Sequence, residues 1–281
     1  METYTMKNEQ IQSYAESLRM EEHSESTVQK YANALTTFYG WLGEDKSVTK
    51  ERLLLWKAEI SVKNAASTVN VMLSAVNRFF LFMSWEDIRM KRLKTQRRIF
   101  RDRDRELSKA EYLRLLDAAR RRGNPRLYYL TQTLAATGIR VSELRFVTVE
   151  SLRSGATVVD CKGKRREILI PKNLRGKLLT YCKDMGIASG SVFVTRSGKP
   201  LNRSNIWREL QSLCDAAHVD RRKVFPHNFR HLFAVTFYRA EKDIAKLADL
   251  LGHASINTTR IYIMESGAEH ERQIERLGLV V

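Results

Sequence analysis

The stretch ATVVDCKGKRREILIP, residues 156–171, decides the fold class because it carries the clearest β-strand signal in the chain. Two short runs rich in β-branched residues flank a basic turn, a pattern typical of a β-hairpin. A further short strand and turn are expected in residues 189–200. Elsewhere apolar residues recur at spacings of three and four, which indicates helices. The sequence therefore predicts a mainly α-helical protein with a small β-hairpin or sheet, an α+β fold.

Working outward from the hairpin, the N-terminal part of the chain is expected to be entirely helical. Each of its four periodic segments begins near a Ser, Thr or Asn suited to N-capping. In the second segment one face is apolar, formed by Val28, Tyr31, Leu35, Phe38 and Leu42. The four expected helices lie in residues 8–20, 24–43, 49–61 and 66–85. We therefore expect a four-helix domain over residues 1–93.

A basic segment, KTQRRIFRDRDRE at residues 94–106, separates this domain from the rest of the chain. Such a charge run is more often a solvated linker than a site, although a linker can also lie along phosphates. The second domain, residues 107–281, opens with a helix in which Ser108 and Glu111 fit a capping box. A further helix follows Pro125 and is expected to end at Gly138.

The charge balance points to a polyanionic partner. The 281 residues include 49 Lys and Arg against 32 Asp and Glu, a formal net charge of +17. Nucleic acid is the first candidate and an anionic membrane surface the second. No run approaches the roughly 18 apolar residues of a membrane span, so a cytoplasmic protein is expected. Cys161, Cys182 and Cys214 are widely spaced and predict reduced thiols rather than disulfides or a zinc site.

Two segments of the second domain combine basic residues with turns. In TGIRVSEL, Arg140 and Glu143 are three residues apart. They fit either a capped helix start with a surface arginine or an arginine held by a carboxylate to face a phosphate. The hairpin turn carries four basic residues, Lys162, Lys164, Arg165 and Arg166. This turn is either exposed to solvent, or it brings a lysine beside a scissile phosphate, where the lysine protonates a leaving alkoxide.

A third segment, FPHNFRHLFA at residues 225–234, places His227, Arg230 and His231 in the first turns of a helix. The His-x-x-x-His spacing suits zinc, but Asn228 stands where the metalloprotease motif needs Glu. The other interpretation is a histidine and an arginine aimed at one anion. Because the next turn is apolar, a hydrogen-bonded core role is favoured for His231 over metal ligation.

The fourth segment, LLGHASINTTRIYI at residues 250–263, resembles the second half of a helix-turn-helix. A protein that only reads DNA needs neither His253 in the turn nor Tyr262 beyond it. A tyrosine at helical spacing is most often a core residue. Taken with the other three segments, however, the set of arginines, histidines, lysine and tyrosine suits attack of a tyrosine hydroxyl on a DNA phosphodiester.

These motifs, in the order TGIRVSEL, CKGKRRE, HNFRH, LGH and TTRIY, resemble those of the tyrosine recombinase (lambda-type integrase) family, particularly its Xer-like and transposon or phage integrase members. The resemblance covers nearly the whole chain. It implies a SAM-like four-helix core-binding domain that binds DNA, a linker and a catalytic domain. It also implies a site-specific recombinase that cleaves and rejoins DNA through a 3′-phosphotyrosyl intermediate, without metal, ATP or another cofactor.

The resemblance also implies roles for individual residues. Tyr262 is the expected nucleophile, and Arg140 and Arg230 are expected to hold the non-bridging oxygens of the scissile phosphate. Lys162 is the expected general acid, with Lys164 as the other candidate.

Of the histidines, His227 is the expected general base and His253 the expected hydrogen-bond partner of the phosphate. Glu143 is expected to brace Arg140, with His231 in a supporting position.

The family further implies a homo-oligomer, a tetramer in the synaptic complex on double-stranded DNA, with the tail from about residue 265 exchanged between protomers. Accessory DNA-bending or partner recombinase proteins belong to the same expectation, whereas no arm-binding module is expected ahead of the first helix. Three alternatives remain at this stage. They are a non-catalytic helix-turn-helix regulator, a zinc hydrolase built on His227, His231 and His253, and a type IB topoisomerase-like enzyme.

Overall fold

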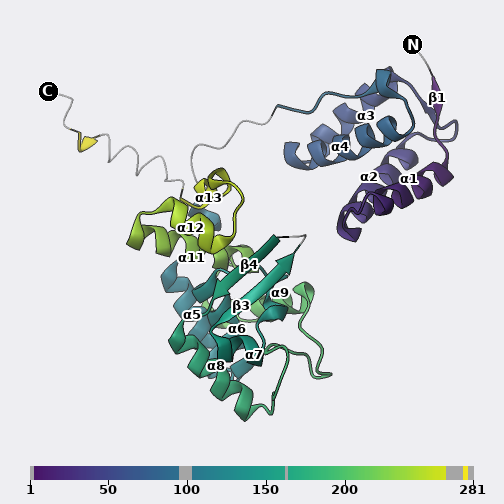
Figure 1. The fold of residues 1–281 in the computed structure, drawn as a ribbon. Helices are drawn as coiled ribbons and strands as arrows, with labels where there is room; N and C mark the ends of the chain where they lie inside the picture. Colours follow the sequence, from purple (N-terminus) through teal and green to yellow (C-terminus); the bar gives the residue numbers. More distant parts are fainter. Residues whose placement is uncertain (1–2, 95–102, 162–163, 264–274, 278–281) are drawn as a thin grey trace. The chain divides into compact units, whose positions relative to one another are not determined.

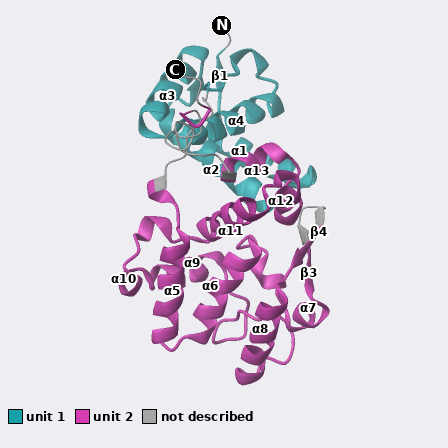
Figure 2. Cartoon of the chain, turned by 90° about the vertical axis from the view of Figure 1, so that its left-hand side faces the viewer, with its two compact units in different colours: residues 1–97 teal, residues 98–281 magenta. Residues whose placement is uncertain are grey.

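The computed structural model divides the chain into two compact units, residues 1–97 and 98–281 (Figure 2). It describes residues 3–94, 103–161, 164–263 and 275–277. Most of the described chain is helical, and the strands form two small antiparallel pairs. The expected mainly α fold with a small β-hairpin is therefore confirmed.

Unit 1 is built from four helices (Figure 1). They are α1 (Asn8–Met20), α2 (Glu25–Trp41), α3 (Lys50–Lys63) and α4 (Ala66–Phe82), followed by the 3₁₀ turn η1 (Glu86–Ile88). A pair of two-residue strands that the sequence did not predict, β1 (Tyr4–Thr5) and β2 (Ser47–Val48), ties the start of the chain to the α2–α3 connection. Runs of two residues are too short to show an alternating pattern, so no periodicity could reveal them.

The core of unit 1 is rich in aromatic side chains. Tyr14, Phe38, Trp56, Phe79 and Phe80 are all almost fully buried. Their rings lie edge to face or tilted, with centroids 4.8 Å apart for Phe38 and Trp56 and 5.6 Å apart for Tyr14 and Phe79. Such pairs stabilise a core beyond the burial of apolar area. This core packs the four helices into one compact unit.

Unit 2 is mixed, with the hairpin at one side of a group of helices (Figure 2). The elements are η2 (Arg103–Arg105), α5 (Lys109–Arg121), α6 (Pro125–Thr137), η3 (Leu144–Phe146), α7 (Val149–Ser154), β3 (Ala156–Cys161), β4 (Lys164–Leu169), α8 (Lys172–Asp184), α9 (Arg203–Gln211), α10 (Cys214–Ala217), η4 (Arg221–Lys223), α11 (Pro226–Glu241), α12 (Ile244–Leu251) and α13 (Ile256–Ile263). The strand and turn expected at residues 189–200 are reduced to two isolated bridges, Thr148 with Ser191 and Val194 with Pro200.

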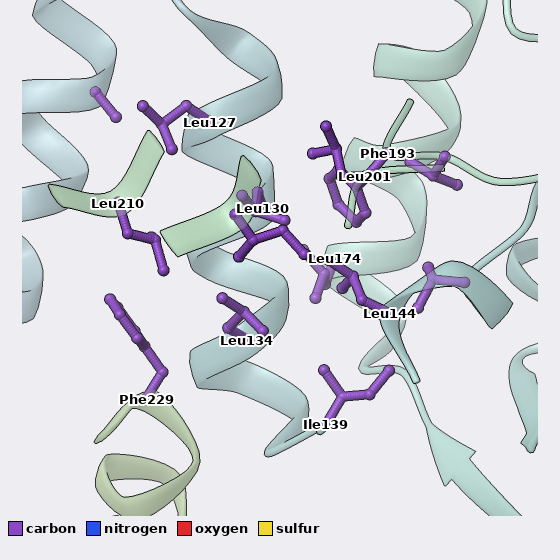
Figure 3. Packing of buried hydrophobic residues seen from close by; sticks show 14 of the residues in the cluster. Leu127, Leu130, Leu134, Ile139, Leu144, Leu174, Phe193, Leu201, Leu210 and Phe229 are labelled. Atoms are coloured by element: carbon purple, nitrogen blue, oxygen red, sulfur yellow. The ribbon is translucent and has the colours of Figure 1, made fainter. Parts of the chain in front are cut away.

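Helix α6 runs through the middle of the core of unit 2. Its residues Leu127, Leu130 and Leu134 are buried and face side chains from α9, α11 and the 190s loop, as Figure 3 shows. The predicted capping box of Ser108 and Glu111 is present at the start of α5. The buried core fixes the C-terminal end of α6, and this end carries the first of the site motifs.

Left-handed glycines end two of the helices that border the site. Gly138 ends α6 with φ +59°, and Gly252 ends α12 with φ +60°. Glycine adopts this conformation without the steric cost of a Cβ atom, so both helices can stop sharply. Arg140 and His253 follow directly after these turns. The two helix ends therefore position the side chains that were expected to meet a phosphate.

Candidate active site

Five of the expected site residues, from four separate segments, converge on one cleft of about 880 Å³ in unit 2. Arg140 comes from the loop after α6, and His227 and Arg230 from the first turns of α11. His253 comes from the α12–α13 turn and Tyr262 from α13. Helices α11, α12 and α13 lie side by side at one end of the unit (Figures 1 and 2). A cluster of Ala234, Leu247, Leu251 and Tyr262 packs between them.

Tyr262 lies buried among three histidine rings, with only 5% of its surface exposed. Its ring centroid is 5.6 Å from that of His227, 5.3 Å from His231 and 5.7 Å from His253, and the last pair is stacked. The Tyr262 hydroxyl is 3.5 Å from Nε2 of His227. This distance is long for a hydrogen bond, yet contacts between nucleophile and base are often looser before the substrate binds. The hydroxyl can pass its proton to His227.

Arg230 is a buried cation whose guanidinium binds two backbone carbonyls and a histidine. Nη1 donates to the carbonyl of Gly138 at 2.6 Å, and Nη2 donates to the carbonyl of Leu251 at 2.7 Å and to Nε2 of His253 at 2.9 Å. Burial and the nearby Arg140 lower the pKa of Arg230 to about 10, partly offset by Tyr262. Arg230 therefore stays positively charged at neutral pH, and its bonds to carbonyls fix its orientation.

His253 is held neutral by its neighbours. A guanidinium can only donate, so Nε2 of His253 accepts from Arg230, and Nδ1 carries the proton and donates to Oγ1 of buried Thr259 at 2.8 Å. Burial lowers the pKa of His253 to about 4, helped by the charges of Arg230, Arg140 and Arg166. Burial, followed by the two arginines of the site, also lowers the pKa of His227. Both rings are uncharged at neutral pH, as a proton acceptor must be.

Glu143 is almost fully buried between two arginines. Its carboxylate accepts from the Arg140 backbone N at 2.9 Å and from Arg140 Nη1 at 2.8 Å. The other partner is Arg166 of β4, whose Nε is 3.3 Å from Oε1 and whose Nη2 pairs with Oε2. Of the two interpretations of TGIRVSEL, the structure has the arginine held by a carboxylate. Glu143 precedes the 3₁₀ turn η3, but its side chain makes no capping hydrogen bond there.

His231 packs against the Tyr262 ring without lining the cleft, and its Nε2 is 3.6 Å from a carboxylate oxygen of Glu106. The zinc-hydrolase alternative fails on geometry, because the imidazole nitrogens of His253 face Arg230 and Thr259 rather than the other histidines. Among the described residues no group of three or more His, Cys, Asp or Glu could hold a metal ion. Lys162 lies outside the described residues, and the side chain of Lys164 is likewise not described.

The cleft also contains residues that motif analysis did not single out. Arg203, Trp207 and Arg208 of α9 line it, and the Trp207 side chain is about half exposed. With Arg140 and Arg230, four arginines line the cleft, and none of its described lining residues is acidic. Their spacing on α9 is that of an ordinary amphipathic helix, so only the tertiary structure reveals their proximity to Tyr262. The cleft suits an anionic ligand with flat apolar surfaces.

Known proteins resemble the chain along its whole length. The family model for the phage integrase family matches residues 105–269, and that for the phage integrase N-terminal SAM-like domain matches residues 11–87. The tyrosine recombinase XerA of Pyrococcus furiosus is 28% identical over 100% of this chain and 98% of its own length. The tyrosine recombinase XerC of Roseiflexus castenholzii is 29% identical over 91% of this chain and 88% of its own.

Solved structures share the fold. A lambda integrase dimer bound to a COC′ core site superposes with a TM-score of 0.74, at 16% identity, over 92% of this chain and 77% of that one.

These findings define an enzyme of the tyrosine-recombinase class, a site-specific recombinase. The phage integrase family model matches more than half of the chain. The chain belongs to the phage integrase family.

The class leaves the helix-turn-helix regulator without support. Helices α12 and α13 and the turn between them do exist, but the turn brings His253 against Arg230, and α13 buries Tyr262 instead of presenting it to solvent. Within the described parts of the chain, no helix is both long and apolar enough to cross a bilayer.

Proposed function

We propose that the protein recombines specific DNA sites by transesterification, with Tyr262 as the nucleophile. The observation that carries this proposal is the burial of Tyr262 against neutral His227 and charged Arg230 in an arginine-lined cleft. A tyrosine hydroxyl with an ordinary pKa of about 10 is a weak nucleophile at neutral pH. It needs a base at the hydroxyl and positive charge at the phosphate, and the cleft offers both.

In the first step the Tyr262 oxygen attacks the scissile phosphorus while His227 accepts the hydroxyl proton. The phosphorus bond to the 5′-oxygen breaks, leaving a 3′-phosphotyrosyl linkage and a 5′-hydroxyl. Lys162 donates the proton that the leaving 5′-oxygen takes up; its place in this step rests on the family resemblance. The reverse reaction, with a 5′-hydroxyl from another strand, rejoins the DNA without metal or ATP, because the phosphotyrosyl bond retains the energy of the broken phosphodiester.

Arg140 and Arg230 stabilise the charge that develops on the non-bridging oxygens. Arg230 is already oriented by two carbonyls, and Arg140 by Glu143, so little reorganisation is needed when the phosphate arrives. Preorganised donors of this kind contribute on the order of 10² to 10³ each in rate. The phosphate offers His253 a negatively charged acceptor, which favours a protonated Nε2 facing the phosphate in place of the bond from Arg230.

The α9 face extends the site along the DNA. Arg203, Trp207 and Arg208 all line the cleft. We place the DNA backbone next to the scissile phosphate along these arginines, with the Trp207 ring against a deoxyribose or base. The four-helix unit 1 is the expected second DNA-binding domain, and the net charge of +17 favours a polyanion for the chain as a whole.

The active assembly is expected to form on double-stranded DNA as a tetramer in the cytoplasm, with or without accessory proteins. Lambda integrase has been solved as a tetramer bound to a Holliday junction. The tail beyond Tyr262, which lies largely outside the described residues, would join protomers by docking on a neighbour. Deleting residues 268–281 should therefore leave strand cleavage intact but abolish completed exchange. Wild-type strand exchange by the truncated protein would refute the tail's role.

The test of the nucleophile is a nicked suicide substrate, in which cleavage releases a short strand and traps the covalent complex. Wild type should form an adduct with DNA in EDTA that survives denaturant, and Tyr262→Phe should form none. An adduct that persists in Tyr262→Phe would mean that another residue attacks. If the wild type binds the recombination site tightly and never forms an adduct, the proposed activity is wrong.

A further inference from the structure

Arg166 is a largely buried basic residue of the hairpin to which the proposed chemistry gives no role. It lies on β4, opposite Val159 in the strand register, and only 14% of its side chain is exposed. Nε and Nη2 face the two oxygens of Glu143, and Nη1 donates to the carbonyl of Leu250 at 3.1 Å. One guanidinium therefore joins the hairpin to the Arg140 loop and to the C-terminal end of α12.

Both partners of Arg166 are connected to the arginines that line the cleft. Glu143 also binds Arg140, through the backbone N and Nη1. Leu250 precedes Leu251 and Gly252, whose carbonyls accept from Arg230 and Arg140 respectively. Gly252 lies so close to the Arg166 side chain that an added Cβ atom would overlap it. The Arg166 side chain therefore packs against the turn that carries His253.

The state of Glu143 depends on this contact as well. Burial alone would raise the pKa of Glu143, but hydrogen bonds from Arg166 and then Arg140 outweigh burial and lower it. Without Arg166, the carboxylate would lose two of its four donors while remaining buried, an arrangement that is strongly unfavourable. Glu143 would then move towards solvent or towards Arg140, and either movement shifts the Arg140 guanidinium.

We infer that Arg166 is a positioning residue for DNA cleavage. It holds Glu143 and the C-terminal end of α12 in place, so that the guanidinium groups of Arg140 and Arg230 are oriented toward the scissile phosphate. The inference rests on the proposed function. Arg166 is not among the residues that line the cleft, and each of its three nitrogens already donates to Glu143 or Leu250. Its side chain is 14% exposed, against 40% for that of Arg140, so we give Arg166 no direct contact with the phosphate. A lysine cannot replace it, since one ammonium cannot span a carboxylate and a carbonyl with the same planar fork.

The experiment compares Arg166→Met and Arg166→Lys with wild type in single-turnover cleavage of two nicked substrates. One has an ordinary scissile phosphate, and the other has a methylphosphonate, in which a neutral methyl group replaces one charged oxygen. An arginine that matters through the charge of that phosphate matters less when the charge is removed. Arg140→Ala serves as the reference for this behaviour.

We expect Arg166→Met to cleave the ordinary phosphate about 10² times more slowly than wild type. On the methylphosphonate this deficit should shrink at least roughly tenfold, as for Arg140→Ala. Arg166→Lys, which keeps the charge and is the variant more certain to fold, should show the same pattern with a smaller loss. Thermal melting and DNA-binding measurements on each variant report its folding separately.

The matched control is Arg126→Met. Arg126 also bridges a carboxylate and a carbonyl, Glu209 at 2.6 Å and Val194 at 2.7 Å, and it does not line the cleft. This variant should lose stability but keep the wild-type ratio of rates on the two substrates. Equal losses on both substrates for the Arg166 variants, or rates within a few-fold of wild type, would overturn the inference. Failure of wild type itself to form an adduct would instead refute the proposed function.

Discussion

At the scale of single residues, the contacts of His253 keep its imidazole ring neutral. His253 accepts from Arg230 and donates to Thr259, so both ring nitrogens are satisfied without a second proton. Its pKa of about 4 follows from burial first and from the surrounding arginines second. A bound phosphate adds negative charge beside the ring, and a nearby negative charge favours the protonated imidazole. We therefore expect DNA binding to raise the pKa of His253.

This arrangement predicts a specific pH dependence of stability for the DNA-free protein. The folded pKa of His253 lies below the unfolded value of about 6.5, so the unfolded state binds more protons between these two values. The stability contributed by a neutral His253 is therefore present above pH 6.5 and is lost as the pH falls towards 4. The difference in unfolding free energy between wild type and His253→Gln, measured by urea denaturation, should decrease over this window.

The control for this measurement is His218→Gln, because His218 is an exposed histidine at the end of α10. Its difference from wild type, measured over the same pH range, is the baseline. A His253→Gln difference that varies with pH no more than this baseline would contradict a neutral, half-buried His253.

At the scale of elements, the α12–α13 turn depends on a glycine for two reasons. Gly252 has φ +60°, which an L-residue adopts only at a cost, and the Arg166 side chain fills the space where a Cβ atom would lie. Gly198 has φ +75° with open space around it. Gly198→Ala therefore isolates the backbone cost, about 1 kcal/mol, from the steric conflict.

We expect Gly252→Ala to be less stable than Gly198→Ala and to cleave the suicide substrate at least about tenfold more slowly than wild type, because Arg166 and the His253 turn must both move. Gly198→Ala should cleave at the wild-type rate. Thermal unfolding compares the stabilities of the two variants, and single-turnover cleavage compares their rates with that of wild type. Equal stability and equal cleavage would show that the Arg166 side chain yields easily to a methyl group.

The elements also show which features a sequence can reveal. The capping box at Ser108 and the left-handed end of α6 at Gly138 depend on neighbouring residues only, and both were predicted. The bond from Arg166 to Glu143 spans 23 residues, and that from Arg166 to Leu250 spans 84. The sequence therefore presented Arg166 only as one more charge in a basic turn. The place of Trp207 in the cleft likewise depends on how α9 packs, which no local pattern encodes.

At the scale of the whole molecule, one chain supplies the described parts of the site. Tyr262 lies on α13, which packs on α11 and α12 of the same chain, and its hydroxyl is 3.5 Å from His227. Tyr262 should therefore attack the phosphate that is held by the arginines of its own protomer. Whether the tyrosine and the arginines of one active site come from the same protomer can be tested in a mixed assembly, in which protomers with different defects share one DNA site.

Mixing Tyr262→Phe with Arg140→Ala distinguishes the two possible sources of the nucleophile. If the tyrosine acts within its own protomer, each variant remains defective beside the other, and the mixture forms no more adduct than the variants do separately. If the tyrosine is exchanged, the Arg140→Ala chain supplies its hydroxyl to the intact arginines of its neighbour, and an adduct on that chain appears. A size tag on one variant identifies the chain, and wild type mixed with the double variant verifies that mixed assemblies form. We expect no complementation, because exchange would require α13 to leave the buried contacts that hold Tyr262 against His227.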